Sequence, residues 1–396
     1  MKKLIVLSMV FAMAFSVVMP VVALTEGDAS SGLTRGTGGG EPPAIKVKWE
    51  MKGTVGADDS TNAGAQFNAP GTWGSNMTYK VCAIATDPNG AADITGVYAD
   101  IYYPERKAIH DRVPSTDVHR DTAGGAQDVG QGGCGAFIEE NTLVKMTKDA
   151  GYTLFCNNIR NNNENLPVFN EAYGPFSGMT RAQMYSEICA TDGELMKETA
   201  YVYCDTKTLV WEDPAGLYTV KVFAQDQSGN NSLILQNNFE YLPLTKLAKD
   251  FTNVSYGQVL LNTDKKISGD LNFAESTPDG FPTIRNLGNT RLWVGIAQDD
   301  MGLGQSSGVY NVKFDARVGN NEKDWSPKYY PFKLKGTAGN PAPEQYMRLE
   351  DILDLSETEE IDFSILVTKW PDVAPTYNGN IWLNVTPAPF RICPAS

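Results

Sequence analysis

YKVCAIATDPNG, residues 79–90, is a run of alternating residues, rich in β-branched and aromatic types, that ends in an Asp-containing turn. YTVKVFAQDQSGN, residues 218–230, repeats this pattern, and VYADIYYP at 97–104 continues the first run. Such runs, with Gly where a positive φ is needed, are typical of antiparallel strands joined by tight turns. We therefore predict a mainly β chain in which both runs belong to one immunoglobulin-like β-sandwich.

The N-terminus has the pattern of a secretion signal. Lys2 and Lys3 precede an apolar run from Leu4 to Ala23. Residues 1–23 are therefore predicted to be a cleaved signal peptide, and an uncleaved anchor is the alternative because the run is long enough to span a bilayer. With no second apolar segment of that length, we expect an extracellular, cell-surface protein without a membrane span after signal cleavage.

The composition bears on partners and on domain number. The formal net charge of −14 repels phosphate backbones, so nucleic acid is not expected as a partner, and it attracts divalent cations. Hydrophobic residues make up 42% of 396 residues, which is enough to bury real cores and suits two domains better than one.

Cysteine is the residue type that most directly indicates the compartment. In an exported chain an even count indicates disulfides, although six cysteines allow 15 pairings. The six are Cys82, Cys134, Cys156, Cys189, Cys204 and Cys393. Because Cys393 alone lies in the second half, it bridges to the first domain, pairs with another molecule or stays free. No CxxC pair or Cys/His cluster occurs, so zinc is not expected, nor is any other cofactor.

The pattern along the chain divides it into a lead-in and two domains. Residues 24–43 are rich in Gly, Ser and Thr and predict a flexible linker. The first sandwich is assigned to 44–244, and its first strand, Ile45–Met51, alternates apolar and charged residues as if one face were solvated. The second sandwich is assigned to 245–396.

The stretch between the two halves of the first sandwich is too long for an ordinary loop, so we predict an insertion at about 105–210. Residues 152–156 look strand-like, and capping-box pairs predict a broken helix from about 180 to 199. Four cysteines fall in this insertion, which favours a disulfide-stapled subdomain.

Short strand candidates separated by turn signals predict that the second domain is also an antiparallel sandwich. In Ile361–Val367 the four apolar side chains point one way, while Asp362 and Ser364 point the other. The candidates are Val259–Leu261, Thr283–Arg285, Arg291–Ala297, Tyr310–Ala316, Tyr329–Leu334, Ile361–Val367 and Ile381–Val385.

Four Asn-X-Ser/Thr sequons are candidate glycosylation sites, and their chance occurrence in an Asn-rich chain is the equal alternative. They are Asn76, Asn230, Asn253 and Asn384. Asn384 is expected to be exposed, because it alternates with the apolar residues of its strand.

Acidic clusters at Asp58-Asp59, Asp299-Asp300 and 357–362 offer the hard oxygen ligands that calcium prefers. None has the spacing of a defined calcium loop, so solvated surface is the preferred interpretation, calcium is the alternative, and no metal ligand is assigned. Asp87 and Asp226 are expected to accept hydrogen bonds from their own turns.

His110 and His119 lie near carboxylates and can act as metal ligands or as a general acid and base. Their spacing matches no metal motif, so a surface loop is the preferred interpretation and no catalytic residue is assigned. Aromatic residues at Trp325–Phe332 can stack on sugar rings or, alternatively, fill a core or a subunit contact.

Five segments carry a resemblance to a known group: IKVKWEM at 45–51, ATDPNG at 85–90, VYADIYYP at 97–104, PTIRNLGNT at 282–290 and NVKFDAR at 311–317. In these segments the chain resembles exported surface proteins of methanogen-type archaea. This resemblance implies a role in the cell envelope as part of a sheath, surface layer or surface filament. It supplies no active-site residue.

We therefore expect a non-enzymatic structural protein of the archaeal cell envelope that self-associates or binds other envelope proteins, with possible disulfide links and glycosylation. The alternative is an extracellular adhesion protein that binds glycans. A secreted hydrolase built around His110 and His119 has the least support.

Overall fold

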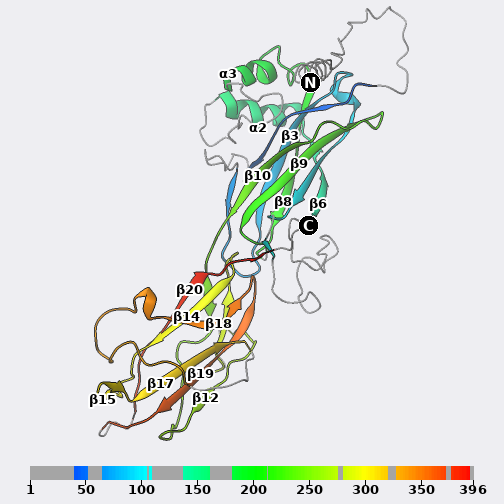
Figure 1. The fold of residues 1–396 in the computed structure, drawn as a ribbon. Helices are drawn as coiled ribbons and strands as arrows, with labels where there is room; N and C mark the ends of the chain where they lie inside the picture. The colour runs from blue at the N-terminus through cyan, green and yellow to red at the C-terminus, as the bar shows by residue number, and fades with distance from the viewer. Residues whose placement is uncertain are drawn as a thin grey trace, which may run out of the picture. The chain divides into compact units, whose positions relative to one another are not determined.

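The computed structural model describes residues 40–51, 65–104, 107–108, 137–160, 181–211, 213–274, 280–319, 327–371 and 376–392. Within these ranges the chain is mainly β and forms two β-sandwiches (Figure 1). Strands of the first lie between Ala44 and Leu242, and strands of the second lie between Leu247 and Pro387. The predicted fold class is confirmed. The predicted signal peptide at 1–23 and most of the linker at 24–43 lie outside the described residues.

The first sandwich pairs a four-stranded sheet with a five-stranded sheet. The order in the four-stranded sheet is β1 (Ala44–Met51), β3 (Met77–Thr86), β8 (Ala200–Leu209) and β7 (Val144–Lys145). The order in the five-stranded sheet is β2 (Gln66–Asn68), β10 (Leu235–Leu242), β9 (Gly216–Asp226), β4 (Ile94–Tyr102) and β6 (Phe137–Thr142). The two sequence runs at 79–90 and 218–230 thus supply inner strands of opposite sheets.

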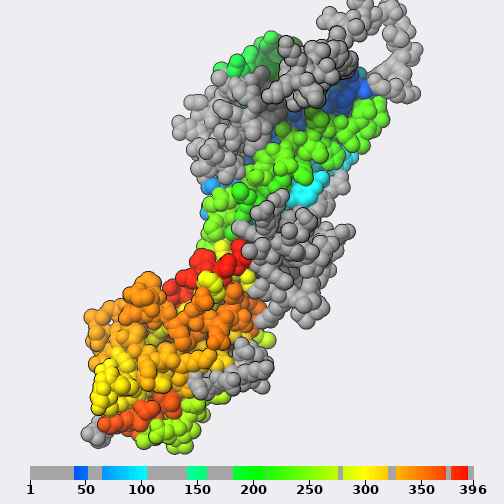
Figure 2. All heavy atoms as spheres, in the orientation of Figure 1, coloured from blue at the N-terminus to red at the C-terminus, as the bar shows by residue number. Residues whose placement is uncertain are grey.

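Aromatic side chains fill the space between these sheets. Alternate residues of β9 are buried, as the strand period requires. The Tyr218 ring stacks on Phe239 with centroids 5.0 Å apart, and Phe239 also lies 5.0 Å from Tyr79 of the facing sheet. The Tyr218 hydroxyl donates to the Pro214 carbonyl at 2.8 Å, which removes the cost of burying it. In the space-filling view, the green segment that includes β9 and β10 covers much of the visible face of this sandwich (Figure 2).

A helical layer packs on part of the outer face of the four-stranded sheet. It consists of α2 (Lys148–Arg160), α3 (Arg181–Met184) and the π-helical turn η4 (Tyr185–Cys189). Phe155 of α2 lies 5.2 Å from the Trp49 ring of β1, and the Cys156–Cys189 disulfide joins α2 to η4. Figure 1 shows α2 and α3 beside the end of the sheet. No helix in the described part of the chain is long and apolar enough to cross a membrane.

The secondary structure of this layer differs from the sequence prediction at two places. Residues 152–156, predicted as strand, lie inside α2, where Tyr152, Phe155 and Cys156 share the helix side that packs on the sheet. The helix predicted to reach residue 199 ends at Cys189, because Ala190 is extended with ψ 167°, and residues 190–199 form turns and bends.

The insertion is also shorter than predicted. The sequence places its end at about residue 210, but β8 pairs with β3 along its full length, from Ala200 opposite Thr86 to Leu209 opposite Met77. Cys204 lies opposite Cys82 and is disulfide-bonded to it. Residues 200–209 therefore belong to the sheet itself.

The face of β1 that was predicted to be solvated is buried. A bulge between Ile45 and Val47 shifts the register of β1 against β3. Lys48 and Glu50 are each only 1% exposed, and their side chains form an ion pair at 2.6 Å. Asn237 of β10, in the facing sheet, donates to the other oxygen of Glu50 at 2.8 Å. The charged side of β1 therefore lies between the sheets.

The second sandwich is arranged around β19 (Thr358–Val367) and β14 (Leu292–Gln298). β19 pairs with β13 (Thr283–Asn286), β12 (Lys265–Ile267) and β17 (Val312–Val318), and β13 pairs with β11 (Leu247–Lys249). β14 pairs with β18 (Met347–Leu353) and β20 (Ile381–Pro387). A short hairpin, β15 (Gln305–Ser306) and β16 (Val309–Tyr310), precedes β17. Phe314 and Phe363 are fully buried in the core between the sheets.

Five of the seven predicted strands of this domain overlap observed ones. Val259–Leu261 and Tyr329–Leu334 instead contribute only isolated bridges, at Leu261, Tyr329 and Lys333. The predicted alternation in Ile361–Val367 is correct, but Asp362 and Ser364 are buried as well. Asp362 accepts a hydrogen bond from the Gly269 backbone at 2.8 Å, which shows that a second segment covers that side of the strand.

Near the end of the described chain, β21 (Arg391–Ile392) pairs antiparallel with β5 (Lys107–Ala108). This pairing joins two segments that are far apart in the sequence.

Candidate ligand-binding site

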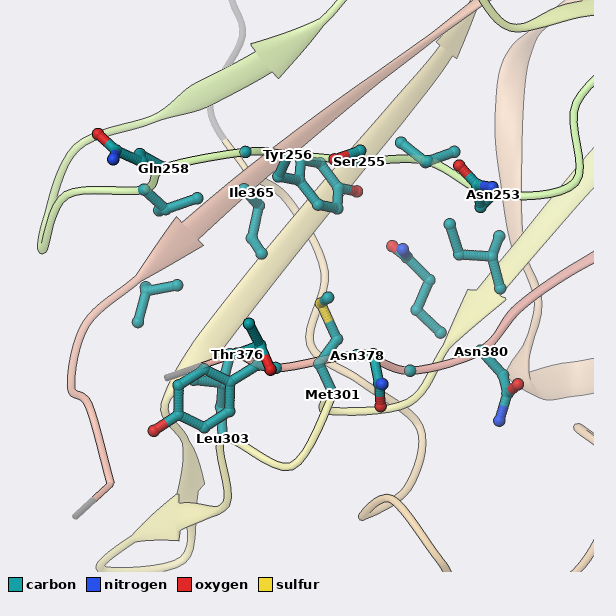
Figure 3. Close-up of a pocket in the computed structure, with 18 of the residues that line it drawn as sticks. Asn253, Ser255, Tyr256, Gln258, Met301, Leu303, Ile365, Thr376, Asn378 and Asn380 are labelled. Carbon is teal, nitrogen blue, oxygen red and sulfur yellow. The ribbon is translucent and has the colours of Figure 1, made fainter. Parts of the chain in front are cut away.

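The second sandwich contains a pocket of about 990 Å³. The segments 249–260 and 376–383 form two of its sides, and β19 and the end of β14 contribute further lining residues. In Figure 3 residues 253–258 lie along one side and residues 376–380 along the other, with Ile365 and Met301 between them. The size lies in the range of pockets that hold small organic ligands.

The lining combines apolar residues with side-chain amides. The lining residues contributed by β19 and β20 are all apolar, and they include Ile365, Val367 and Leu383. The amide residues of the lining are Asn253, Gln258, Gln298, Asn378 and Asn380. Amides both donate and accept hydrogen bonds, so this arrangement suits a ligand with hydroxyl or amide groups on an apolar frame.

Two aromatic rings form one part of the pocket wall. Trp370 and Tyr377 stack with centroids 5.4 Å apart and an interplanar angle of 27°. Trp370 is 37% exposed, and the Tyr377 hydroxyl donates to the Pro371 carbonyl at 3.2 Å. The pair thus offers a fixed aromatic surface to a ligand.

A buried hydroxyl faces the same region. Tyr256 is 6% exposed, and no hydrogen bond of ordinary geometry reaches its hydroxyl. Burial raises the pKa of Tyr256, and the nearby Gln298 side chain partly opposes that rise. Gln298 Oε1 accepts from Tyr329 at 2.5 Å, and the Gln298 side chain also lies close to the Tyr256 hydroxyl.

Charge is nearly absent from the pocket. Lys249 is the only charged residue among the described lining residues, and its ammonium group donates to the Phe251 carbonyl at 2.6 Å. A pocket with almost no charge in a chain of net charge −14 favours a neutral ligand.

The sequence prediction did not find this pocket. The aromatic segment chosen from the sequence starts at Trp325, which lies outside the described residues, and its Tyr329 is half-buried against Gln298. The segment WPDVAPTYNGN, residues 370–380, held the usable signal, since it combines Trp and Tyr with two Pro and two Asn residues.

Three of the four sequons are exposed: Asn76, Asn253 and, as expected, Asn384. Asn230 is half-buried, and its amide donates to Asp226 at 2.9 Å and to the Gly40 carbonyl at 3.0 Å. Its geometry is therefore the least suited to modification. Asn253 lies on the pocket lining, so a glycan there would lie beside the pocket.

Two disulfides are present in the described chain, Cys82–Cys204 and Cys156–Cys189. Cys134 and Cys393 lie outside the described residues, as do His110, His119 and the Asp58-Asp59 cluster.

The other acidic clusters are not solvated surface. Asp299 and Asp300 are at most 1% exposed. Asp300 accepts from the Gly302 and Gly304 backbones at 3.1 and 2.6 Å, and Asp299 accepts from the Met301 backbone at 3.0 Å. These carboxylates hold a loop in place, which explains their burial without a metal ion.

Glu357 in the third cluster is expected to make stability depend on pH. Burial raises its pKa to about 8, and Glu359 and Asp354 add like charge. The folded state therefore keeps a proton on Glu357 at pH values where the unfolded chain, with its ordinary pKa of 4.5, has released it. The contribution of this proton to the free energy of unfolding is full below about pH 4.5 and is lost as pH rises through about 8. Glu357→Gln should flatten the fall in unfolding free energy between pH 5 and 8, measured by urea denaturation.

Glu350→Gln is the matched control for this measurement. Glu350 is exposed and pairs with Lys328 at 3.0 Å, which lowers its pKa. Its substitution should leave the slope between pH 5 and 8 unchanged, and an equal slope in the Glu357→Gln protein would contradict the assignment.

Comparison with known proteins gives remote structural matches alone. No family model matches the chain, and no curated protein matches it. Matched solved structures include the CsuC-CsuE chaperone-tip adhesion subunit complex of Acinetobacter baumannii (11% identity, TM-score 0.21, 81% of this chain and 96% of that chain). The C-terminal domain of the Streptococcus agalactiae AgI/II polypeptide BspA (12%, 0.20, 88% and 96%) and the CupB6 tip adhesin of Pseudomonas aeruginosa (10%, 0.21, 87% and 96%) also match. At these scores we base no functional argument on them, and the resemblance to methanogen surface proteins stays a prediction.

Proposed function

We propose that this chain is an extracellular, non-enzymatic protein of the adhesion type, whose second sandwich binds a neutral sugar or sugar-like ligand. The observation that carries the proposal is the stacked pair Trp370–Tyr377 in a pocket rich in amides and nearly free of charge. Aromatic faces pack on the C–H faces of sugars, while amides bind their hydroxyls.

The chemistry of the lining supports binding over catalysis. Sugar hydrolysis ordinarily requires two carboxyl groups at the scissile bond. The described lining residues include no Asp, Glu, His or Cys. A ligand in this pocket therefore has no general acid or base beside it from these residues.

The disulfides support an extracellular location. Cys82 of β3 is fully buried under the helical layer, and its bond to Cys204 joins β3 to the neighbouring strand β8. Bonds of this kind form and persist in oxidising compartments.

Substitution of Trp370 by Ala tests the binding proposal. We expect a glycan array to identify a neutral sugar bound by the unmodified protein, and the substitution to weaken that binding about tenfold by calorimetry. Tyr330→Ala is the control, since Tyr330 is an exposed aromatic residue of the same sandwich outside the pocket lining. An array without a bound sugar, or full binding by the Trp370→Ala protein, would count against the proposal.

Assembly into a surface layer, sheath or filament is a second proposal. It is favoured by β20, which is one of the two terminal strands of its sheet, because an uncovered strand edge can pair with another chain. Electrophoresis of thiol-blocked protein from its cells, with and without reductant, tests covalent assembly through Cys393. Multimers that collapse on reduction would support it, and a single monomer band in both lanes would exclude cross-linking.

A further inference from the structure

Three buried aspartates from separate segments meet at one end of the first sandwich. Asp87 lies in the turn after β3, Asp93 ends the 3-10 turn η1 (Ala91–Asp93), and Asp226 is the last residue of β9. They are 3%, 6% and 2% exposed. One carboxylate oxygen from each lies within 4.8 Å of those of the other two. Three acidic side chains thus converge where little water reaches them.

The turns hold two of these carboxylates in fixed positions. As the sequence predicts, Asp87 Oδ1 accepts from the Asn89 backbone at 2.6 Å and Asp226 Oδ1 accepts from the Asn230 backbone at 2.7 Å. The Gln227 backbone also donates to the Asp93 carbonyl at 2.9 Å, which ties the two turns together. The cluster is therefore preorganised by the backbone.

One oxygen of the cluster has no role in the turns. Asp87 Oδ2 is buried and has no hydrogen-bond partner, which is costly for a carboxylate oxygen. Burial raises the pKa of Asp87, and the charges of Asp93 and Asp226 add to the rise. Burial acts to raise the pKa of Asp226, but hydrogen bonds from Asn230 and the turn lower it overall.

We propose that Asp87, Asp93 and Asp226 bind a hard divalent cation, of which calcium is the best fit. Calcium takes six to eight oxygen ligands in flexible geometry, so the three carboxylates of these two turns suit it, with carbonyl and water oxygens completing the shell. No histidine or cysteine belongs to the cluster, which disfavours zinc and copper. A bound cation gives Asp87 Oδ2 its missing partner.

The position of the site suggests what the cation does. The Asn230 amide donates to the Gly40 carbonyl at 3.0 Å, and the Asn89 amide donates to the Glu41 carbonyl at 3.3 Å. The two turns that form the site therefore also hold the residues that lead into β1. Cation binding should therefore stabilise the segment just before β1, where the predicted linker at 24–43 enters the domain.

Calorimetric titration of the EDTA-treated full chain with calcium chloride tests the site. We expect saturable binding with a Kd on the order of 0.1–1 mM, as in extracellular modules, and a rise in Tm of a few degrees at about 10 mM calcium, which EDTA reverses. Asp93→Asn should weaken binding at least about tenfold. Asp250→Asn is the control, since Asp250 is a buried aspartate of the second sandwich that accepts backbone hydrogen bonds.

Amide hydrogen exchange gives a local readout that does not depend on the variants folding. Calcium should slow exchange at residues 87–93 and 226–230 in the unmodified protein. Absence of binding up to about 10 mM calcium, or binding that leaves exchange in these two turns unchanged, would overturn the proposal. Equal affinity of a folded Asp93→Asn protein would overturn it as well.

Discussion

Replacing Cys82 and Cys204 together with alanine should lower the free energy of unfolding by about 5 kcal/mol. The disulfide closes a loop with a sequence separation of 122 residues, so it restricts a large part of the unfolded chain. It also joins β3 to β8, which are neighbouring strands at the centre of their sheet. Guanidinium denaturation of the oxidised protein and of the variant measures the difference.

The second disulfide provides a matched control. Cys156 and Cys189 are separated by 33 residues, and the same chain-entropy argument gives a loss of about 4 kcal/mol for their double alanine variant. That loss should fall mainly on the helical layer, because this bond joins α2 to η4. A larger loss from Cys156/Cys189 than from Cys82/Cys204 would contradict the assignment of the larger constraint to the sheet.

The β-sandwich fold could be predicted because its inner strands follow simple periodicities. Tyr218, Val220, Val222 and Ala224 place an apolar residue at every second position, and the structure buries all four. Ile361, Phe363, Ile365 and Val367 show the same spacing of apolar residues and are all buried, although Asp362 and Ser364 between them are buried too. Where one set of apolar side chains faces a core, the period of two is visible in the sequence itself.

Other features depend on contacts that the sequence does not show. Residues 152–156 are rich in β-formers, yet the sheet face beneath them favours a helix that buries Tyr152, Phe155 and Cys156 together. The bulge at Ile45–Val47 has no marker in the sequence, although it determines which side of β1 meets the facing sheet. The aspartate cluster joins residues 87 and 93 to residue 226, and only the pairing of β4 with β9 brings them together.

Substituting Lys48 by Met should lower the free energy of unfolding by about 3–5 kcal/mol. The change removes the cation that pairs with Glu50 and leaves a carboxylate that is 1% exposed without its counter-charge. Burial lowers the pKa of Lys48, and Glu50 opposes that effect. The unfolded chain therefore binds this proton more tightly, so the Lys48 contribution to stability rises with pH toward 10.5, and the Met variant should lack that rise.

Lys207→Met is the control that separates burial from pairing. Lys207 pairs with Asp205 at the same 2.6 Å and the same spacing of two residues, but the Asp205 side chain is 35% exposed. Water can solvate Asp205 after the change, so the loss should be about 1 kcal/mol or less. The double variant Lys48→Met with Glu50→Leu should recover most of the loss, because no buried charge remains. If Lys48→Met and Lys207→Met cost the same, the pair between the sheets is solvated in the folded protein and the bulge in β1 does not bury it.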